Sequence, residues 1–145
     1  MSEYCHSWRL KLSTTKTVTS FFHLHNASSS RRLAVLMDGQ PLKHDSFPVY
    51  LGVTLDRTLS YRQHLQKTAA KVKSRKNLPS KLAGSSWGAN ADTLRTSALA
   101  LCYSVAEYCC PVWFRSAHTD LVDAQLNSSM RLISGTLRPT QLPER

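Results

Sequence analysis

Apolar and polar side chains alternate in the first part of the chain and predict short β-strands there. Residues 8–12 alternate between apolar and basic side chains, which is the period of a half-buried strand. Residues 17–22 are rich in β-branched and aromatic side chains, and residues 33–37 alternate again. The Asp38-Gly39 pair that follows is a strong hairpin signal. We therefore expect a small antiparallel sheet in this part of the chain.

One further apolar run is expected to provide the last strand of this sheet. Residues 50–55 are mostly apolar but are interrupted by Gly52, which fits a strand with a bulge or a close backbone approach. Asp56 ends the run, and a basic segment with helical periodicity begins at the next residue. These features divide the chain into a strand-containing region, residues 1–56, and a helical region, residues 57–145.

Residues 57–82 are predicted to form one basic helix. Apolar side chains recur at three- and four-residue spacing from Tyr61 to Val72 and form a single stripe. Pro79 is expected to end or kink the helix near Leu78. The segment has no acidic residue, and its eight cations are Arg57, Arg62, Lys67, Lys71, Lys73, Arg75, Lys76 and Lys81. Eight cations without an acid exceed what solubility requires and favour contact with phosphates, the alternative being a solvated helix face.

Two more helices are expected after the basic one. Asn90 or Asp92 can cap the first of them, and Pro111 closes it. Thr119 can cap the second, which Gly135 stops. Three helices joined by short loops make a small bundle. The expected architecture is therefore α+β, with the sheet first and the helices second.

The charge balance narrows the classes of partner. The chain has 145 residues and carries 19 Lys and Arg against 9 Asp and Glu, a net charge of +10. This excess attracts polyanions, so nucleic acid is the first partner to consider and an anionic membrane surface the second. The basic helix has only a thin apolar stripe, and the weakly polar run 98–106 is far too short to span a bilayer, so no membrane partner is expected. The sequence shows no secretion signal, and an intracellular location, nuclear or cytoplasmic, is expected.

The cysteines and histidines do not predict a metal site. Cys109 and Cys110 are adjacent, and no Cys-x-x-Cys spacing occurs. Cys102 and Cys109 are expected to be small buried residues on one helix face. His23 and His25 place two imidazoles on one strand face without a third ligand. No metal and no cofactor are therefore expected.

Four segments, in this order, resemble motifs of the reverse transcriptases of non-long-terminal-repeat (LINE-type) retrotransposons. Residues 8–17 look like the stretch that follows the family's catalytic Asp-Asp motif, with a Trp, alternating Leu and a Lys-Thr pair. Residues 50–56, Tyr-Leu-Gly-Val-Thr-Leu-Asp, are similar to the hairpin that grips the primer end. Residues 103–113 resemble a thumb signature of Tyr, Glu-Tyr, Pro and Trp, and residues 126–140 complete the series.

The resemblance implies the end of a polymerase palm, residues 1–56, followed by a thumb-like three-helix bundle, residues 57–145. It implies a truncated RNA-directed DNA polymerase that holds template and primer, as an RNA–DNA hybrid or a primed duplex. Leu51 and Gly52 would lie close to the primer strand. Lys16 corresponds to a family Lys near the phosphates of the incoming nucleotide and would be a catalytic remnant, the alternative being a solvated surface Lys.

The catalytic aspartates of the family have no counterpart in this chain. The dipeptide Asp-Asp does not occur, and Asp38, Asp45 and Asp56 are scattered among predicted turns. Two-metal phosphoryl transfer needs clustered carboxylates. We therefore expect that the isolated chain is not an enzyme and that it does not hold the Mg²⁺ that intact family enzymes use.

A second hypothesis comes from a different functional class. The chain would then be a small basic helical module that binds RNA or a protein partner and has no polymerase role. Preference for a duplex distinguishes the two hypotheses. Trp8 and Trp113 are expected to be packing residues under either hypothesis. Trp87 lies in a Gly-rich connector and is a candidate for stacking on a base.

Overall fold

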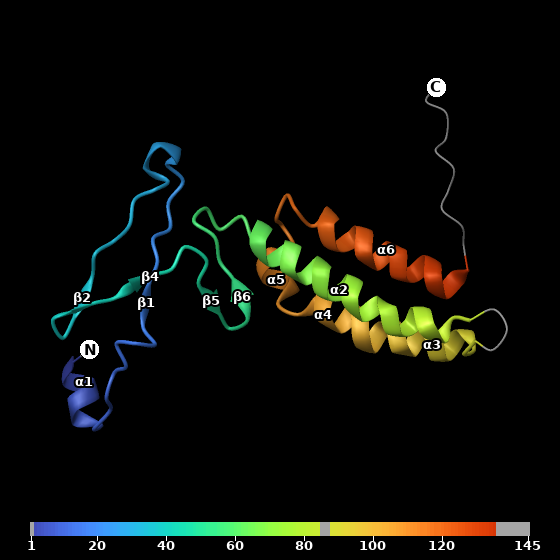
Figure 1. Cartoon of the computed structure of the whole chain (residues 1–145), viewed down its shortest axis with the longest axis horizontal. Coiled ribbons are helices and arrows are strands. Elements are labelled where there is room, and N and C mark those ends of the chain that lie inside the picture. Colours follow the sequence, from blue (N-terminus) through green and yellow to red (C-terminus); the bar gives the residue numbers. More distant parts are fainter. Residues whose placement is uncertain (1, 85–87, 136–145) are drawn as a thin grey trace. The chain divides into compact units, whose positions relative to one another are not determined.

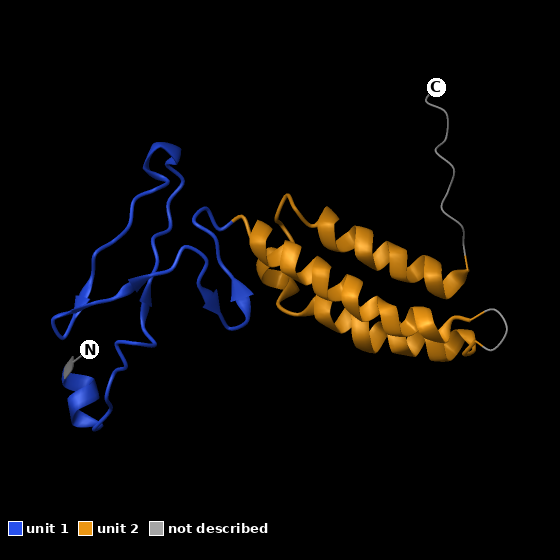
Figure 2. Cartoon of the chain, in the orientation of Figure 1, with its two compact units in different colours: residues 1–59 blue, residues 60–145 orange. Residues whose placement is uncertain are grey.

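The chain divides into two compact units, residues 1–59 and residues 60–145 (Figure 2). The structure is a computed structural model, and it describes residues 2–84 and 88–135. Short strands lie in the first unit and the long helices lie in the second (Figure 1). The chain is therefore α+β, with its boundary three residues after the expected one.

The first unit contains only short elements of secondary structure. Helix α1 (Ser2–Ser7) and the 3₁₀ turn η1 (Asn26–Ser28) accompany six strands: β1 (Val18–Thr19), β2 (Leu36–Met37), β3 (Gln40–Pro41), β4 (Lys43–His44), β5 (Val49–Tyr50) and β6 (Val53–Thr54). The strands form three separate two-stranded ladders. Strands β1 and β4 are parallel, whereas β2–β3 and β5–β6 are antiparallel. The prediction of one antiparallel sheet is therefore wrong.

The expected strand at residues 8–12 is absent from the described structure. Trp8, Leu10 and Leu12 are exposed, Trp8 to 66% of its surface. An alternating strand is stable only when its apolar face packs on a partner, and the exposure of these three side chains shows that no such face is buried here. The expectation that Trp8 is a packing residue is wrong for the same reason.

Two hairpins give the first unit its regular turns. Asp38 and Gly39 both have positive φ values, 51° and 75°, and join β2 to β3 as predicted. Leu51 and Gly52 have φ values of 46° and 80° and join β5 to β6. Two successive residues with positive φ match the right-handed twist of paired strands. Residues 50–55 therefore contain a turn between two strands, not one bulged strand.

The first unit buries little apolar surface. Among its described hydrophobic residues only Val53 is buried, with 4% of its surface exposed. Fifteen large hydrophobic side chains of this unit are exposed, Leu24 and Leu51 most of all. Hydrophobic burial is the main force that stabilises a fold. The paired strands and hairpins of this unit therefore have little core to support them.

Three long helical segments form the second unit. The first is α2 (Arg62–Leu82), and the third is α6 (Asp120–Ser134). Between them, α3 (Ala91–Ala98), the π-helical turn η2 (Leu99–Tyr103) and α4 (Ser104–Glu107) form one continuous run, which the short helix α5 (Cys110–Trp113) follows. Helix α2 contacts both of the other long segments (Figure 1).

Buried side chains from all these segments form one core. It consists of Leu65 and Val72 from α2, Cys102 from η2, Ala106 from α4, Trp113 from α5 and Val122 from α6. The predictions that Cys102 is a small buried residue and that Trp113 is a packing residue are confirmed. Cys109 is only half-buried and lies beyond the end of α4, because the backbone leaves the helical conformation at Tyr108, whose ψ is 122°.

The helix ends agree in part with the sequence signals. The Asn90 side chain accepts a hydrogen bond of 2.9 Å from the Thr93 amide, so Asn90 caps α3 as predicted. Gly135 ends α6 with a φ of 66°. Thr119 occupies the N-cap position of α6, but its side chain does not cap the helix. Pro79 does not end α2 at Leu78, because its buried ring packs in the last turn and the helix continues to Leu82.

Candidate nucleic-acid interface

Helix α2 separates a buried face from a basic one. The residues His64, Leu65, Thr68, Val72 and Pro79 are buried. Leu65, Thr68 and Val72 are spaced by three and four residues and Pro79 follows seven residues later, so they lie on one side of the helix. The cations Arg62, Lys67, Lys71, Lys73, Arg75 and Lys81 are all exposed. The helix contains no acidic residue that would neutralise them.

Five of the six exposed cations lie in two rows along α2. Lys67, Lys71 and Arg75 are four residues apart and follow one another along one side of the helix. Arg62 and Lys73 are eleven residues apart, about three helical turns, and lie on a second side. The exposed cations therefore extend along the length of α2, from Arg62 to Lys81. Such a surface can contact phosphates without reading a base sequence.

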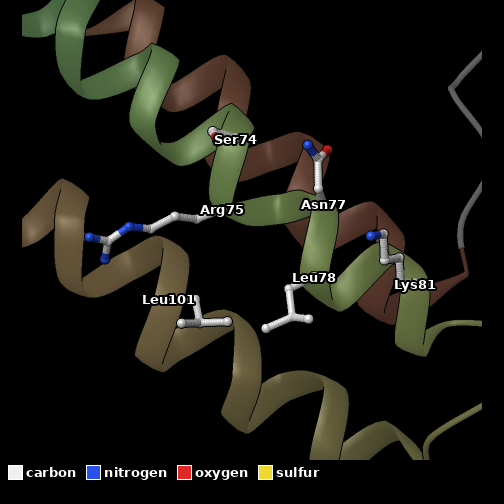
Figure 3. A pocket seen from close by; sticks show the side chains of 6 residues that line it. All are labelled: Ser74, Arg75, Asn77, Leu78, Lys81 and Leu101. Carbon is white, nitrogen blue, oxygen red and sulfur yellow. The ribbon is translucent and has the colours of Figure 1, made fainter.

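A hollow of about 280 Å³ lies beside the first row of cations. In Figure 3, Leu78 of α2 and Leu101 of η2 point toward each other across the gap between their helices, and the guanidinium of Arg75 extends toward the second helix. Lys81, Ser74 and Asn77 complete the hollow. No sequence pattern predicted this hollow. The sequence feature that could have indicated it is Leu78, an apolar residue outside the buried stripe of α2, which is 52% exposed.

Two of the eight predicted cations are engaged elsewhere in the chain. The Arg57 guanidinium lies outside α2, in the first unit, and donates to the His23 carbonyl at 3.1 Å, the His25 carbonyl at 3.3 Å and the Asn26 side chain at 3.0 Å. Lys76 is half-buried and is bonded to α6. We therefore exclude both from the interface proposed below.

The other predicted contact residues lie in the first unit. Leu51 and Gly52 form the exposed tip of the β5–β6 hairpin. A non-glycine residue with positive φ is strained, so the structure holds Leu51 in a conformation that its side chain disfavours. Lys16 is exposed in the turn that begins at Ser13, where its amide donates to the Ser13 carbonyl at 3.3 Å.

Carboxylates and imidazoles of the first unit are used in local contacts. Asp45 accepts a hydrogen bond of 2.9 Å from the Phe47 amide, and Asp56 accepts one of 3.1 Å from the Thr58 hydroxyl. The Nδ1 atom of His25 is 3.2 Å from the Ser28 hydroxyl. In residues 2–84 and 88–135, no three His, Cys, Asp or Glu side chains form a group that would hold a metal ion.

His64 lies on the buried face of α2, close to two of its lysines. Burial, and then the nearby charges of Lys71 and Lys67, lower the pKa of His64 below its ordinary value. His64 is therefore held neutral inside a helix that carries many positive charges. Trp87, the candidate for stacking on a base, lies outside the described residues, as does the last part of the motif at residues 126–140.

Comparison with protein-family models, curated proteins and solved structures finds no match to this chain. The family resemblance therefore depends on the four sequence motifs alone. Within the described ranges, no helix has the length and apolar character needed to cross a membrane.

Proposed function

We propose that this chain is the palm end and thumb of a non-long-terminal-repeat retrotransposon reverse transcriptase, and that it binds template–primer nucleic acid through α2. One observation carries the binding proposal: six exposed cations and no acid occupy the solvent side of a 21-residue helix. The contacts would be made to phosphates, so affinity would fall steeply with salt. The proposal includes no catalytic step.

Other features of the molecule support the family assignment. The segment that resembles the primer-gripping hairpin forms a hairpin, with Leu51 and Gly52 at an exposed tip. The segment that resembles the thumb signature supplies Trp113 to the helical core. The first unit leaves much apolar surface exposed, which fits a palm segment that packs on further palm structure.

The test compares two variants that remove the same charge from different places. The first replaces Lys67, Lys71, Lys73 and Arg75 by Ala, which favours a helix. The second replaces four exposed cations of the first unit, Lys11, Arg31, Arg32 and Lys43, by Ala. Both lower the net charge of +10 by four. Binding of a primed RNA–DNA hybrid is measured by fluorescence anisotropy across a salt series.

We expect the α2 variant to bind at least tenfold more weakly. The slope of log affinity against log salt concentration should also become shallower by about two to four, since each lost phosphate contact removes about 0.7 to 0.9 from that slope. The first-unit variant should lose much less affinity. Circular dichroism must show that both variants remain folded. Equal losses in the two variants would mean that only total charge matters, and the assignment to α2 would fail.

A further inference from the structure

A second hollow lies in the helical unit, between α4, α5 and α6, with a volume of about 380 Å³. None of its described lining residues comes from α2, so it is distinct from the proposed nucleic-acid interface. Ligand-binding pockets typically have volumes of about 300 to 1,000 Å³. The hollow is therefore large enough to receive one large side chain or a small molecule.

The walls of this hollow are formed mainly by apolar side chains, and several of them are held in place by the core. Trp113 and Val122 belong to the buried core, and Leu126 is half-buried beside them. The Trp113 indole donates a hydrogen bond of 3.2 Å to the Tyr108 carbonyl, which fixes the ring. Phe114 lines the open side and is 53% exposed. The site is preformed, and an occupant would remain partly open to solvent.

Two carboxylates line this hollow beside its apolar side chains. Glu107 ends α4, Asp123 lies in the first turn of α6, and both line the hollow with exposed side chains. Neither has an ion-pair partner in the part of the chain that the structure describes, although the chain carries 19 Lys and Arg. The guanidinium of Arg115 lies 5.4 Å from the centroid of the Phe114 ring. Arg115 therefore makes a cation–π contact with Phe114 and forms no ion pair with Glu107 or Asp123.

We propose that this hollow binds a partner polypeptide, which inserts one apolar side chain and places an adjacent Lys or Arg between Glu107 and Asp123. The apolar walls select the inserted side chain, and the two carboxylates select the charge beside it. A free small molecule is less suited, because pockets for such ligands usually bury 70–90% of the ligand surface and this hollow is open at Phe114. A polypeptide gains further contacts outside the hollow.

The probes are three terminally blocked dipeptides, Phe-Lys, Phe-Gln and Phe-Glu, which share the apolar side chain and differ in charge. Each is titrated at millimolar concentration into the ¹⁵N-labelled full chain, and the Trp113 indole resonance is followed. We expect affinity in the order Phe-Lys, Phe-Gln, Phe-Glu, with at least a threefold difference between the first and the last. General electrostatics predict the reverse order, since the net charge of the chain is +10.

Two variants separate the hollow from the rest of the surface. Glu107→Gln with Asp123→Asn should abolish the preference for Phe-Lys, because the shape is kept and the charge is lost. Asp92→Asn with Asp120→Asn removes the same charge from exposed positions outside the hollow and should leave the preference unchanged. The proposal is overturned if Phe-Lys binds no better than Phe-Glu, or if the preference survives in the first variant. Loss of the preference in both variants would also overturn it.

Discussion

The Nζ atom of Lys76 in α2 donates a hydrogen bond of 2.8 Å to the Oγ atom of Ser128 in α6. Lys76 is half-buried at this contact, whereas Lys73 and Arg75 on the same helix are exposed. The contact joins two of the three long helical segments. One lysine of the basic run therefore supports the bundle, while its neighbours remain available to a ligand.

Replacing Lys76 by Met should lower the stability of the helical unit without weakening nucleic-acid binding. The variant keeps the aliphatic stem but loses the hydrogen bond to Ser128, a loss of about 1 kcal/mol. Urea denaturation followed by circular dichroism measures the change. Lys73→Met is the matched control and should have the opposite profile, with weaker binding and unchanged stability. A stable Lys76→Met protein that binds poorly would show that this lysine belongs to the interface.

Replacing Asn90 by Ala should destabilise the second helical segment. The Asn90 side chain accepts a hydrogen bond from the Thr93 amide, and loss of such a cap costs about 1 kcal/mol. Asn90→Ser keeps an oxygen acceptor and should retain most of the stability. The free energies of unfolding of the three proteins, from urea titrations, test this. Equal effects of Ala and Ser would argue against the cap.

His64 should make the stability of the helical unit depend on pH. Burial, followed by the charges of Lys71 and Lys67, lowers its pKa, so the unfolded chain binds a proton more readily than the folded one. The contribution of His64 to stability is complete above about pH 6.5 and is lost progressively as the pH falls through the lowered pKa.

Urea midpoints of the natural protein at pH 7.5 and pH 5.5 measure this loss. His64→Gln removes the titrating group and should reduce the difference between the two midpoints. The prediction fails if the variant and the natural protein lose the same stability on acidification, since groups other than His64 would then account for the effect.

Backbone amides should exchange much faster in the first unit than in the second. Val53 is the single buried hydrophobic residue among the described residues of the first unit, whereas the helical unit has a continuous core that includes Leu65, Val72 and Val122. Regions with little buried apolar surface open easily. Hydrogen exchange with mass spectrometry tests this on the full chain. Comparable protection in β1–β4 and in α2 would contradict it.

Local sequence signals predicted the helical unit well. The apolar stripe of α2, the cap at Asn90 and the stop at Gly135 act within a few residues of chain, and each has a direct physical effect on the backbone. Pro79 misled the prediction of the end of α2, because burial of its ring favours the last turn. Sequence spacing does not show that a side chain outside the apolar stripe will be buried.

The strands were harder to predict, because a strand depends on a partner that is distant in the sequence. Residues 8–12 have a clear alternating pattern and remain outside any ladder. The candidate interface shows the same limit. Its cations are visible in the sequence. That Arg57 and Lys76 do not belong to the interface follows only from their hydrogen bonds to Asn26 and Ser128.

The central claim is that the chain holds template–primer nucleic acid as a thumb would. The most direct measurement is fluorescence anisotropy of the purified full chain with a primed RNA–DNA hybrid, compared across a salt series with single-stranded RNA and heparin. We predict tighter binding to the hybrid than to either competitor, with a steep salt slope. Equal affinity for all three would contradict the claim and leave only a basic module that binds any polyanion.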